Sequence, residues 1–498
     1  MDTITHLNLA VNGFPFSKII SLMISHAPNQ HARAEIVGEV EAAIAEDSLQ
    51  RVDEKTMVTI TTTAEGQPST LFYGCVLGAS LQQDNAYSRV VLRLSSVSRL
   101  LDVTTRNKTY QNTAETYGKI IQKNIADQAD LHMMVSDKAI GALIMQYGET
   151  DWAFSLRMAA KLGAPLITNL SSGRAQIYFG LPPSGRTIAE DSLFFSYGSD
   201  SSHRSHAEAM AQDFATETVQ SYAYGYLGDT LSFNGKNSVI KTVKAVLQEG
   251  ILQMEYGLLA GGAGAGSGSG IAGNGAGGRG TAGGSGAGSP GGGAGGFGTA
   301  AGSGLAPVDS GNTQASGKMM KGKVQAVLGD KVQVFLTSVD KEYDAGGNWW
   351  FPYSTTYSSS DGSGWYCMPE KGDEVLVFFP SGNEGEAFVA SSVCASPPSN
   401  PRNKSWKAPG GKEILLTDEG MYIIGKGGKI YINLTDEKGI EIHSDKDINI
   451  SSEANVKILS SSEVNIVAGN QVIIGTEDAY LDITKESATL AASQVLIN

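Results

Sequence analysis

Few side chains in this 498-residue sequence have the type and spacing to do chemistry, and the pair His203 and His206 comes first. With Glu208 in the stretch SSHRSHAEAM, this pair offers nitrogen and carboxylate donors of the kind that bind transition metals. A metal site needs a further cluster of ligands at a matching spacing, and none accompanies the pair. We therefore interpret the stretch as a polar loop and expect no metal site.

An aromatic, serine-rich stretch offers a second chemistry, which is stacking against sugar rings. A platform of this kind would use Trp349, Trp350, Phe351, Tyr353, Tyr357 and Trp365. The sequence favours the alternative, a loop packed at the side of a barrel or between copies of the chain. Carboxylates are plentiful, but no spacing marks an acid–base pair, and GKGGK at 425–429 lacks the P-loop spacing. We expect no catalytic residue, no cofactor and no enzymatic activity.

The strongest pattern is an octad of apolar pairs near the C-terminal end, with mostly polar side chains between them. The pairs are Ile432/Leu434, Ile440/Ile442, Ile448/Ile450, Val456/Ile458, Val464/Ile466 and Val472/Ile474. Two apolar residues separated by one polar residue lie on the same face of a short strand. Each repeat therefore predicts one short strand with a single apolar face. After these pairs the phase slips, with Leu481/Ile483 and finally Val495/Ile497, so we expect the tip to taper or to change geometry.

An octad is too short to close a β-helix by itself. A triangular single-chain turn needs about 18 residues, because successive side chains of a strand advance only about 3.3 Å. We therefore predict that three chains wind together and enclose these twelve side chains as a trimer core, so that folding and trimerisation are one event. An ordinary β-meander and a short-period single-chain solenoid are the alternatives. His443 lies between two pairs and is expected to face solvent, unless another register brings it to an axial ion.

Composition narrows the class of protein further. The net charge is −14, and residues 411–498 alone carry 14 acidic and 7 basic side chains, which argues against a nucleic-acid partner. Three scattered cysteines indicate neither a disulfide framework nor a zinc site. The first residues lack the pattern of a signal peptide, and no apolar run is long enough to span a membrane. We expect folding in a reducing cytoplasm.

The elements that precede the octads predict several folded regions. Strands are expected at 57–63, 69–75 and 89–95, and two helices are expected to begin near Asn112 and at Thr150. Residues 257–304 are dominated by glycine, alanine and serine, and are interpreted as a flexible linker or, alternatively, a glycine helix packed among copies. A hairpin around Gly329-Asp330 and strands in GDEVLVFF and EAFVASSV then predict a compact β domain.

Three stretches resemble the VgrG-like hub–spike proteins of contractile injection systems, which include myophage baseplate hubs and phage late control D proteins. RLLDVTTRNKTYQNTAETYGKIIQ (99–122) and QYGETDWAFSLRMAAKLGAPL (146–166) are similar to hub motifs of this family. GWYCMPEKGDEVLVFFPSGNEGEAFVASSV (364–393) is similar to its oligonucleotide-fold (OB) barrel, and the octads resemble its spike. The glycine-rich insert has no counterpart in this resemblance.

The resemblance implies a mainly β multidomain fold: a hub of two tube-like β domains with helices, an OB barrel and an intertwined trimeric β-helix. The expected division is 1–256 hub, 257–317 glycine-rich linker, 318–396 barrel, 397–411 connector and 412–498 spike. The implied function is to cap the inner tube and to puncture a target envelope when the sheath contracts. The implied partners are two more copies, tube protein and baseplate components, with a PAAR-type tip protein and effector cargo as further candidates.

Two other functions stay open at this point. A tail-associated cell-wall or glycan hydrolase would use the aromatic stretch, and a receptor-binding fibre would share the trimeric β-prism. Assembly in the cytoplasm into a phage tail-like particle or secretion apparatus, and delivery on contraction, is the localisation that the resemblance implies. The sequence does not distinguish a phage, a tailocin and a secretion system.

Overall fold

The computed structural model divides the chain into an N-terminal unit, Met1–Ala395, and a C-terminal unit, Ser396–Asn498. It describes residues 3–64, 66–84, 87–183, 186–189, 194–200, 216–233, 235–259, 309 and 311–495. His203, His206, Glu208 and most of the glycine-rich segment lie outside these residues. Within the described ranges, no helix is long and apolar enough to cross a membrane.

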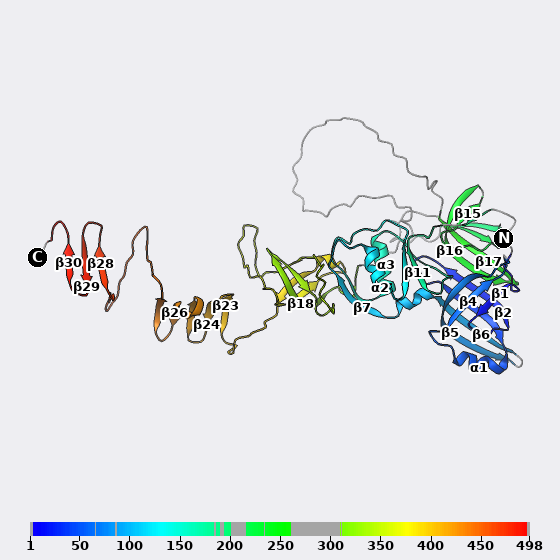
Figure 1. The fold of residues 1–498 in the computed structure, drawn as a ribbon, viewed down its shortest axis with the longest axis horizontal. Coiled ribbons are helices and arrows are strands. Elements are labelled where there is room, and N and C mark those ends of the chain that lie inside the picture. Colours follow the sequence, from blue (N-terminus) through cyan, green and yellow to red (C-terminus); the bar gives the residue numbers. More distant parts are fainter. Residues whose placement is uncertain are drawn as a thin grey trace, which may run out of the picture. The chain divides into compact units, whose positions relative to one another are not determined.

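A large sheet dominates the N-terminal unit and follows the order β1-β4-β5-β6-β3-β2-β16-β17-β14-β13, with β15 paired to both β16 and β12 (Figure 1). Its first strands are β1 (Leu9–Asn12), β2 (Lys18–His26), β3 (Arg33–Val40), β4 (Met57–Thr62), β5 (Ser69–Asp84) and β6 (Tyr87–Ser96). Its later strands are β12 (Thr187–Ile188), β13 (Phe194–Asp200), β14 (Thr216–Ser221), β15 (Thr230–Phe233), β16 (Lys236–Gln248) and β17 (Ile251–Leu259). The three strands expected from the sequence are present as β4, β5 and β6, the last two longer than predicted.

The two strand groups join at one seam, where β2 pairs antiparallel with β16 from Met23–Val246 to His26–Val243. Alternate residues of both groups point into one apolar core, which contains Ile24, Phe72 and Tyr256 at 0% exposure. Helix α1 (Ala42–Gln50) contributes Ala45 to this core. The mainly β fold that the resemblance implied is confirmed, and the two groups of strands join in one sheet over one core.

A layer of helices and short strands follows β6 in the chain. It contains the 3-10 helix η1 (Val97–Asp102), β7 (Thr105–Tyr110), α2 (Tyr117–Ile125), β8 (Ala129–Met133), β9 (Ile144–Thr150), α3 (Asp151–Lys161), β10 (Leu166–Thr168) and β11 (Ala175–Phe179). Helices α2 and α3 lie next to each other in Figure 1 and share a second apolar core with Phe154 and Ile177.

The two helices begin where a side-chain oxygen caps them. Thr150 accepts a hydrogen bond from Ala153 N, as the sequence predicted for α3. The predicted start of α2 near Asn112 is four residues too early, because Thr116 caps this helix by accepting from Lys119 N. The Asn112 carboxamide instead accepts from Ala114 N in a local turn.

The third part of the N-terminal unit is a small barrel of five antiparallel strands in the order β20-β19-β18-β21-β22. The strands are β18 (Lys318–Leu328), β19 (Lys331–Phe335), β20 (Phe351–Pro352), β21 (Glu374–Phe379) and β22 (Phe388–Ser392), with η2 (Glu384–Glu386) before the last. A parallel bridge from Tyr353 to Val389 brings its two ends together. Asn312 and Ala315 are fully buried here, so the end of the expected linker range belongs to the barrel fold.

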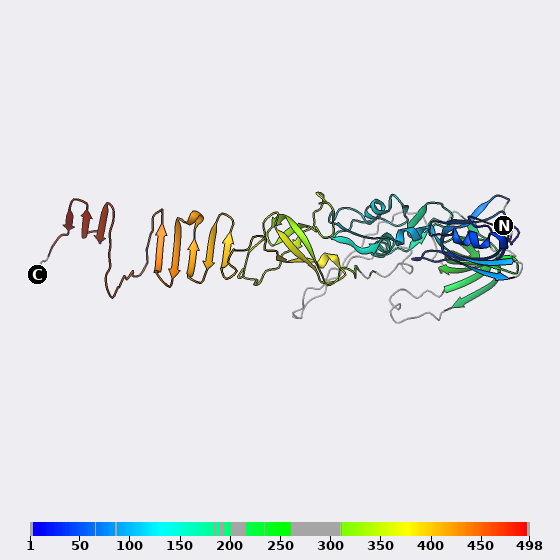
Figure 2. The same cartoon turned by 90° about the horizontal axis from the view of Figure 1, so that it is seen from below.

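The C-terminal unit consists of two antiparallel meanders, drawn as single rows of strands in Figure 2. The first contains β23 (Lys404–Ala408), β24 (Lys412–Leu416), β25 (Gly420–Ile424), β26 (Ile430–Thr435) and β27 (Gly439–Ser444), with the short turn η3 (Lys426–Gly428). The second contains β28 (Gln471–Gly475), β29 (Tyr480–Thr484) and β30 (Ala488–Ala491). Each meander has one layer only.

Candidate assembly site

The pairing register of the first meander brings apolar side chains into two continuous rows on one face. One row runs Trp406, Ile414, Ile423, Ile432 and Ile442, and the other runs Leu416, Met421, Leu434 and Ile440. Directly paired residues of antiparallel strands have Cβ atoms about 5 Å apart on the same face, so the rows form a continuous strip. We call this strip, together with its continuation in β28–β30, the apolar face.

The second meander continues the same arrangement. Val472 pairs with Ile483 and Ile474 pairs with Leu481, and Leu481 pairs onward with Leu490. The phase slip at Leu481/Ile483 is one extra residue, and the turn around Thr476–Ala479 accommodates it. A longer turn thus keeps Leu481 and Ile483 on the same face as the preceding pair, and the expected taper or change of geometry at the tip stays a prediction.

The apolar face is open to solvent in the single chain. Its side chains include Ile440 at 72% exposure and Ile442 at 60%, and no residue of 396–495 is buried. Of the twelve predicted trimer-core residues, Ile432 and Val472 are partly buried and the other ten are exposed. Burying a side chain of this size is worth about 1.5–3 kcal/mol, so covering this face would add a large stabilisation.

The apolar side chains of the middle octads also lack burial, and no strand is assigned to this stretch. Ile448, Ile450, Val456, Ile458, Val464 and Ile466 lie in a stretch, 445–470, to which no strand is assigned. All six are more than half exposed. A segment without strand partners also leaves its backbone N–H and C=O groups outside any sheet. Such groups can pair with a strand of another chain.

The opposite face of the first meander is held together by polar pairs. Tyr431 donates to Glu441 at 3.0 Å and stacks on the His443 ring at 4.9 Å, while Lys407 pairs with Glu413 at 3.5 Å. His443 therefore lies on the face opposite to Ile442, next to it in the chain. This two-faced character is what a prism wall with an apolar interior requires.

A buried ion cluster joins the helical layer to the barrel within the N-terminal unit. The Arg157 guanidinium on α3 contacts Glu384 of η2 at 2.7 Å and makes two bonds to Glu149 at 2.8 and 2.9 Å. It also donates to the Met145 carbonyl at 2.6 Å, and the side chains of Arg157 and Glu384 are only 4% and 1% exposed. Burial opposes the charge of Arg157, but the Glu384 and Glu149 carboxylates outweigh it and raise the pKa of Arg157.

Further bonds fix the same junction, which we call the hub–barrel junction. Asp340 of the barrel accepts from both the backbone and the hydroxyl of Thr109, and Gln111 donates to the Val334 carbonyl at 3.0 Å. Strand β9 contributes to both cores, because Ile144 packs in the helical layer and Met145 packs in the barrel. Hub and barrel are thus connected by charge, hydrogen bonds and shared apolar packing.

His31, Ser98 and Asp102 are arranged like a hydrolase triad, but Ser98 cannot act as its nucleophile. His31 lies 2.9 Å from the Ser98 hydroxyl through Nδ1 and 3.5 Å from Asp102 through Nε2. Ser98 is only 2% exposed and its hydroxyl also bonds to Ser96. A nucleophile must reach a substrate, so this buried hydroxyl does not act as one. The network instead fixes the turn between β2 and β3.

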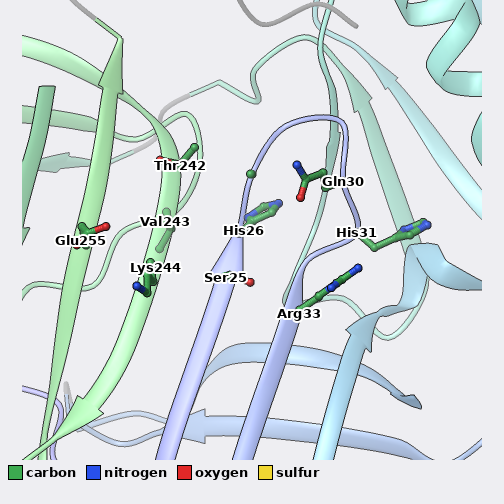
Figure 3. Close-up of a pocket in the computed structure, with 10 residues that line it drawn as sticks. Ser25, His26, Gln30, His31, Arg33, Thr242, Val243, Lys244 and Glu255 are labelled. Carbon is green, nitrogen blue, oxygen red and sulfur yellow. The ribbon is translucent and has the colours of Figure 1, made fainter. Parts of the chain in front are cut away.

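That turn borders a cavity of about 370 Å³ at the seam between the strand groups, shown in Figure 3. His26, at the end of β2, lies on the side of β16 that carries Val243, whereas the His31 ring beyond the turn points away from that strand. Burial lowers the pKa of His26 to about 3 and that of His31 to about 4, although Thr168 and Asp102 respectively favour the charged rings. Both imidazoles are therefore neutral at pH 7.

The aromatic residues proposed as a sugar platform separate into two groups. Phe351 is fully buried in the barrel core, and Trp349 and Tyr353 pack against that core. Tyr357 and Trp365 are about half exposed, at 51% and 54%. No group of three or more metal-binding side chains occurs among the residues that the structure describes, and the His203 stretch is not among them.

Comparison with known proteins adds a family model and several solved structures. Residues 322–393 match the Type VI secretion system/phage-baseplate injector OB domain. The chain is similar to the E. coli c3393 protein, described as a type VI secretion component with structural similarity to T4 bacteriophage tail proteins gp27 and gp5. That match has 15% identity and a TM-score of 0.53, and covers 78% of this chain and 99% of the other.

Two other structures show weaker similarity. A Francisella PdpA–VgrG complex matches with 8% identity and a TM-score of 0.49, over 89% of this chain and 88% of the other. A 43 kDa tail protein of prophage MuSo2 from Shewanella oneidensis matches with 8% identity and a TM-score of 0.39, over 52% and 98%. Comparison with curated proteins finds no match.

These findings define the class of fold. Residues 322–393 match an injector OB domain, and over 78% of its length the chain has the fold of the E. coli c3393 protein. The resemblance drawn from the sequence motifs is thereby confirmed at the level of the fold.

Proposed function

We propose that this chain is the structural hub and spike of a contractile injection system. It would cap the inner tube and be driven through a target envelope when the sheath contracts. The OB-domain match and the likeness to the c3393 protein support this class of function. The proposed mechanism is mechanical and not catalytic, because it requires stiffness, symmetry and a defined order of domains.

The observation that carries the proposal is the exposed apolar face of the C-terminal unit. A trimer of this chain would turn three such faces inward and close a prism whose polar faces meet solvent. The twelve octad residues are the proposed core, and Trp406, Ile414, Ile423 and Leu481 extend it on both sides. Such a prism leaves few lateral strand edges, which suits a protease-resistant rod.

The division of the chain supports distinct roles for its parts. Residues 1–256 would bind tube protein and baseplate components, 318–396 would form the barrel, 397–411 the connector and 412–498 the spike. The linker is proposed within 257–317, without the end of that range, where Asn312 and Ala315 are buried with the barrel. The hub–barrel junction would carry force from the hub to the barrel, because Arg157 and Glu384 are buried and well bonded.

We further propose assembly in the cytoplasm without a signal peptide and delivery as part of a tail-like particle. A PAAR-type protein at the tip and effector cargo are candidate partners, and the envelope is contacted transiently. No nucleic acid and no cofactor take part in this function. The net charge of −14 fits the absence of a nucleic-acid role.

Co-assembly with an inner tube protein of a contractile injection system tests the proposal. Purified full-length chain should bind one end of preformed tubes in negative-stain electron micrographs. A chain with Ile442→Asp, which disrupts the proposed trimer, should lose end binding. Binding of the C-terminal unit to whole cells, without any binding to tubes, would instead identify a receptor-binding fibre.

The hydrolase alternative makes a separate prediction. A cell-wall hydrolase would clear a zone in a zymogram that contains peptidoglycan. We propose that the full-length chain has no such activity, because Ser98 is buried and the aromatic residues are divided between core and surface. Clearing that disappears on substitution of Trp365 would overturn the structural proposal.

A further inference from the structure

The large sheet carries a row of charged side chains on the face opposite to its core, where the two strand groups join. Arg33 of β3 pairs with Ser25 of β2, and Ser25 pairs with Lys244 of β16. Directly paired residues of antiparallel strands lie on the same face. Their chain neighbours Ile24 and Ala245 are buried in the core, so the row faces outward. Arg33 and Lys244 are exposed.

A second row lies beside the first. Arg93 of β6 pairs with Glu35 of β3, and Glu35 pairs with Met23 of β2. A β-bulge in β5 inserts Leu77 just before Gly78, and bulges of this kind re-aim a side chain. Leu77 is 51% exposed. A Cβ atom at Gly78 would lie 3.0 Å from Arg93 Nη2, so the absence of a side chain there leaves room for the guanidinium.

Two cavities of about 370 Å³ each are lined by side chains of these rows, and they adjoin at Arg33, which lines both. Lys244 lines the first cavity, shown in Figure 3, and Arg93 lines the second. Met23 and Leu77 give the second cavity an apolar part. We call the two cavities together the cationic groove.

The three cations of the groove are not engaged in ion pairs. Among the residues that the structure describes, Arg33, Arg93 and Lys244 form no salt bridge. Glu35 lies opposite Arg93 and Glu255 lies opposite Lys244 in the strand register, without a close contact. Three cations against two carboxylates leave an excess of positive charge, in a chain whose net charge is −14. The groove is therefore a local attraction for anionic groups.

The chemistry of the groove fits an acidic segment of a protein. From β5 to β16 the order β5-β6-β3-β2-β16 makes four steps of about 4.8 Å, which roughly six extended residues would cross. A free oxyanion would leave the apolar surface of Leu77 and Met23 unused. A nucleic acid would be repelled by Glu35 and Glu255 and by the net charge of the chain.

We propose that the cationic groove binds an acidic, extended segment of a partner protein. Arg33, Arg93 and Lys244 pair with its carboxylates, and Leu77 contacts an apolar side chain between them. The groove lies within one chain, so this proposal goes beyond the hub–spike function and does not depend on the trimer.

A synthetic peptide tests the proposal on the full-length chain. A fluorescein-labelled peptide of sequence Glu-Leu-Glu-Glu-Leu-Glu should bind saturably in fluorescence anisotropy, more weakly as salt is added. Arg33→Glu, at the point where the cavities adjoin, should weaken binding about tenfold, because it replaces attraction by repulsion. Lys244→Glu, in the other strand group, gives an independent variant with the same expected loss. Leu77→Ala should weaken binding roughly fivefold, through lost apolar contact.

The matched control is Arg89→Glu. Arg89 is exposed and lies on the same face of β6 as Arg93, but it lines neither cavity. This variant should bind the peptide as the unchanged chain does. A peptide with glutamine in place of every glutamate should not bind.

Equal losses for Arg33→Glu and Arg89→Glu, or equal binding of the glutamine peptide, would overturn the proposal. Full competition by inorganic phosphate, together with no effect of Leu77→Ala, would identify a site for small anions instead. Light scattering on the same samples keeps the two proposals apart. A trimer that does not bind the peptide overturns the groove and leaves the hub–spike function intact, whereas a monomer that binds it does the reverse.

Discussion

The strands of both units alternate polar and apolar residues, but only one unit buries its apolar side chains within the chain. In the N-terminal unit, curled sheets cover one another, and Ile24, Phe72 and Val377 are fully buried. In the C-terminal unit the strands alternate equally well, yet no residue of 396–495 is buried. The difference shows that alternation puts the apolar side chains on one face of a strand. Whether the same chain also covers that face depends on whether the sheet closes. One unit completes its core within the chain, whereas the proposed trimer would cover the apolar face of the other with further copies.

The largest expected effect comes from a charge on the apolar face. Ile442→Asp should abolish trimerisation, because three carboxylates would share one layer of the core. At roughly 3–5 kcal/mol for each unpaired buried charge, the loss is about 9–15 kcal/mol per trimer. Light scattering and resistance to guanidinium measure it.

The matched control is the next residue in the chain. His443→Asp changes the opposite face, where His443 stacks on Tyr431, and should leave the trimer intact. Equal losses for the two variants would contradict the assignment of faces.

A smaller loss is expected at the hub–barrel junction. Arg157→Ala leaves the buried Glu384 and Glu149 carboxylates without their partner and should lower the free energy of unfolding of the N-terminal unit by about 3–5 kcal/mol. Urea unfolding of the full-length chain measures this change. Arg174→Ala removes an exposed pair with Asp130 and should cost about 1 kcal/mol or less. A small effect at Arg157 would mean that the junction is not held by charge.

Acid should weaken the N-terminal unit through its buried histidines. The pKa values of folded His26 and His31 are about 3 and about 4, below the ordinary value of 6.5, so the unfolded state binds protons first as the pH falls. Stability is complete above pH 6.5 and is lost between there and pH 4 to 3, at about 1.4 kcal/mol per pH unit for each histidine.

Urea unfolding at a series of pH values measures this slope. His26→Gln should reduce it, whereas substitution of the exposed His6 should not. A slope that is the same in all three proteins would contradict the role of burial at His26.

The smallest expected effect distinguishes the two possible starts of α2. Thr116→Ala removes the cap on Lys119 N and should cost about 1 kcal/mol of stability. Asn112→Ala should cost less, since its side chain serves a turn outside the helix. The reverse order would restore the start that the sequence predicted, and thermal unfolding of the two variants decides it.

The octads were predictable because a polar–apolar alternation with a constant period is a local property. The spacing of Ile440 and Ile442 alone places both side chains on one face, and the register with Leu434 and Ile432 agrees with that face. The rows through Trp406 and Met421 were missed, because their spacing does not follow the octad. Their signal lies in the pairing of hairpins, which depends on turn lengths.

The hub–barrel junction could not be predicted from the sequence. Arg157 and Glu384 are far apart in the chain, and nothing near either residue marks it as buried. Phe351 was expected in a packed aromatic loop, but its place in β20 and in the barrel core depends on the closure of the sheet. Long-range packing decides such cases, and local propensity does not contain it.

The solution mass of the full-length chain, measured by light scattering over a range of protein and denaturant concentrations, tests the central claim most directly. Our account predicts a trimer that persists on dilution and in mild denaturant, and that loses its mass and its C-terminal β structure together. A folded monomer with a protease-resistant C-terminal unit would contradict it, because the apolar face would then be covered within one chain.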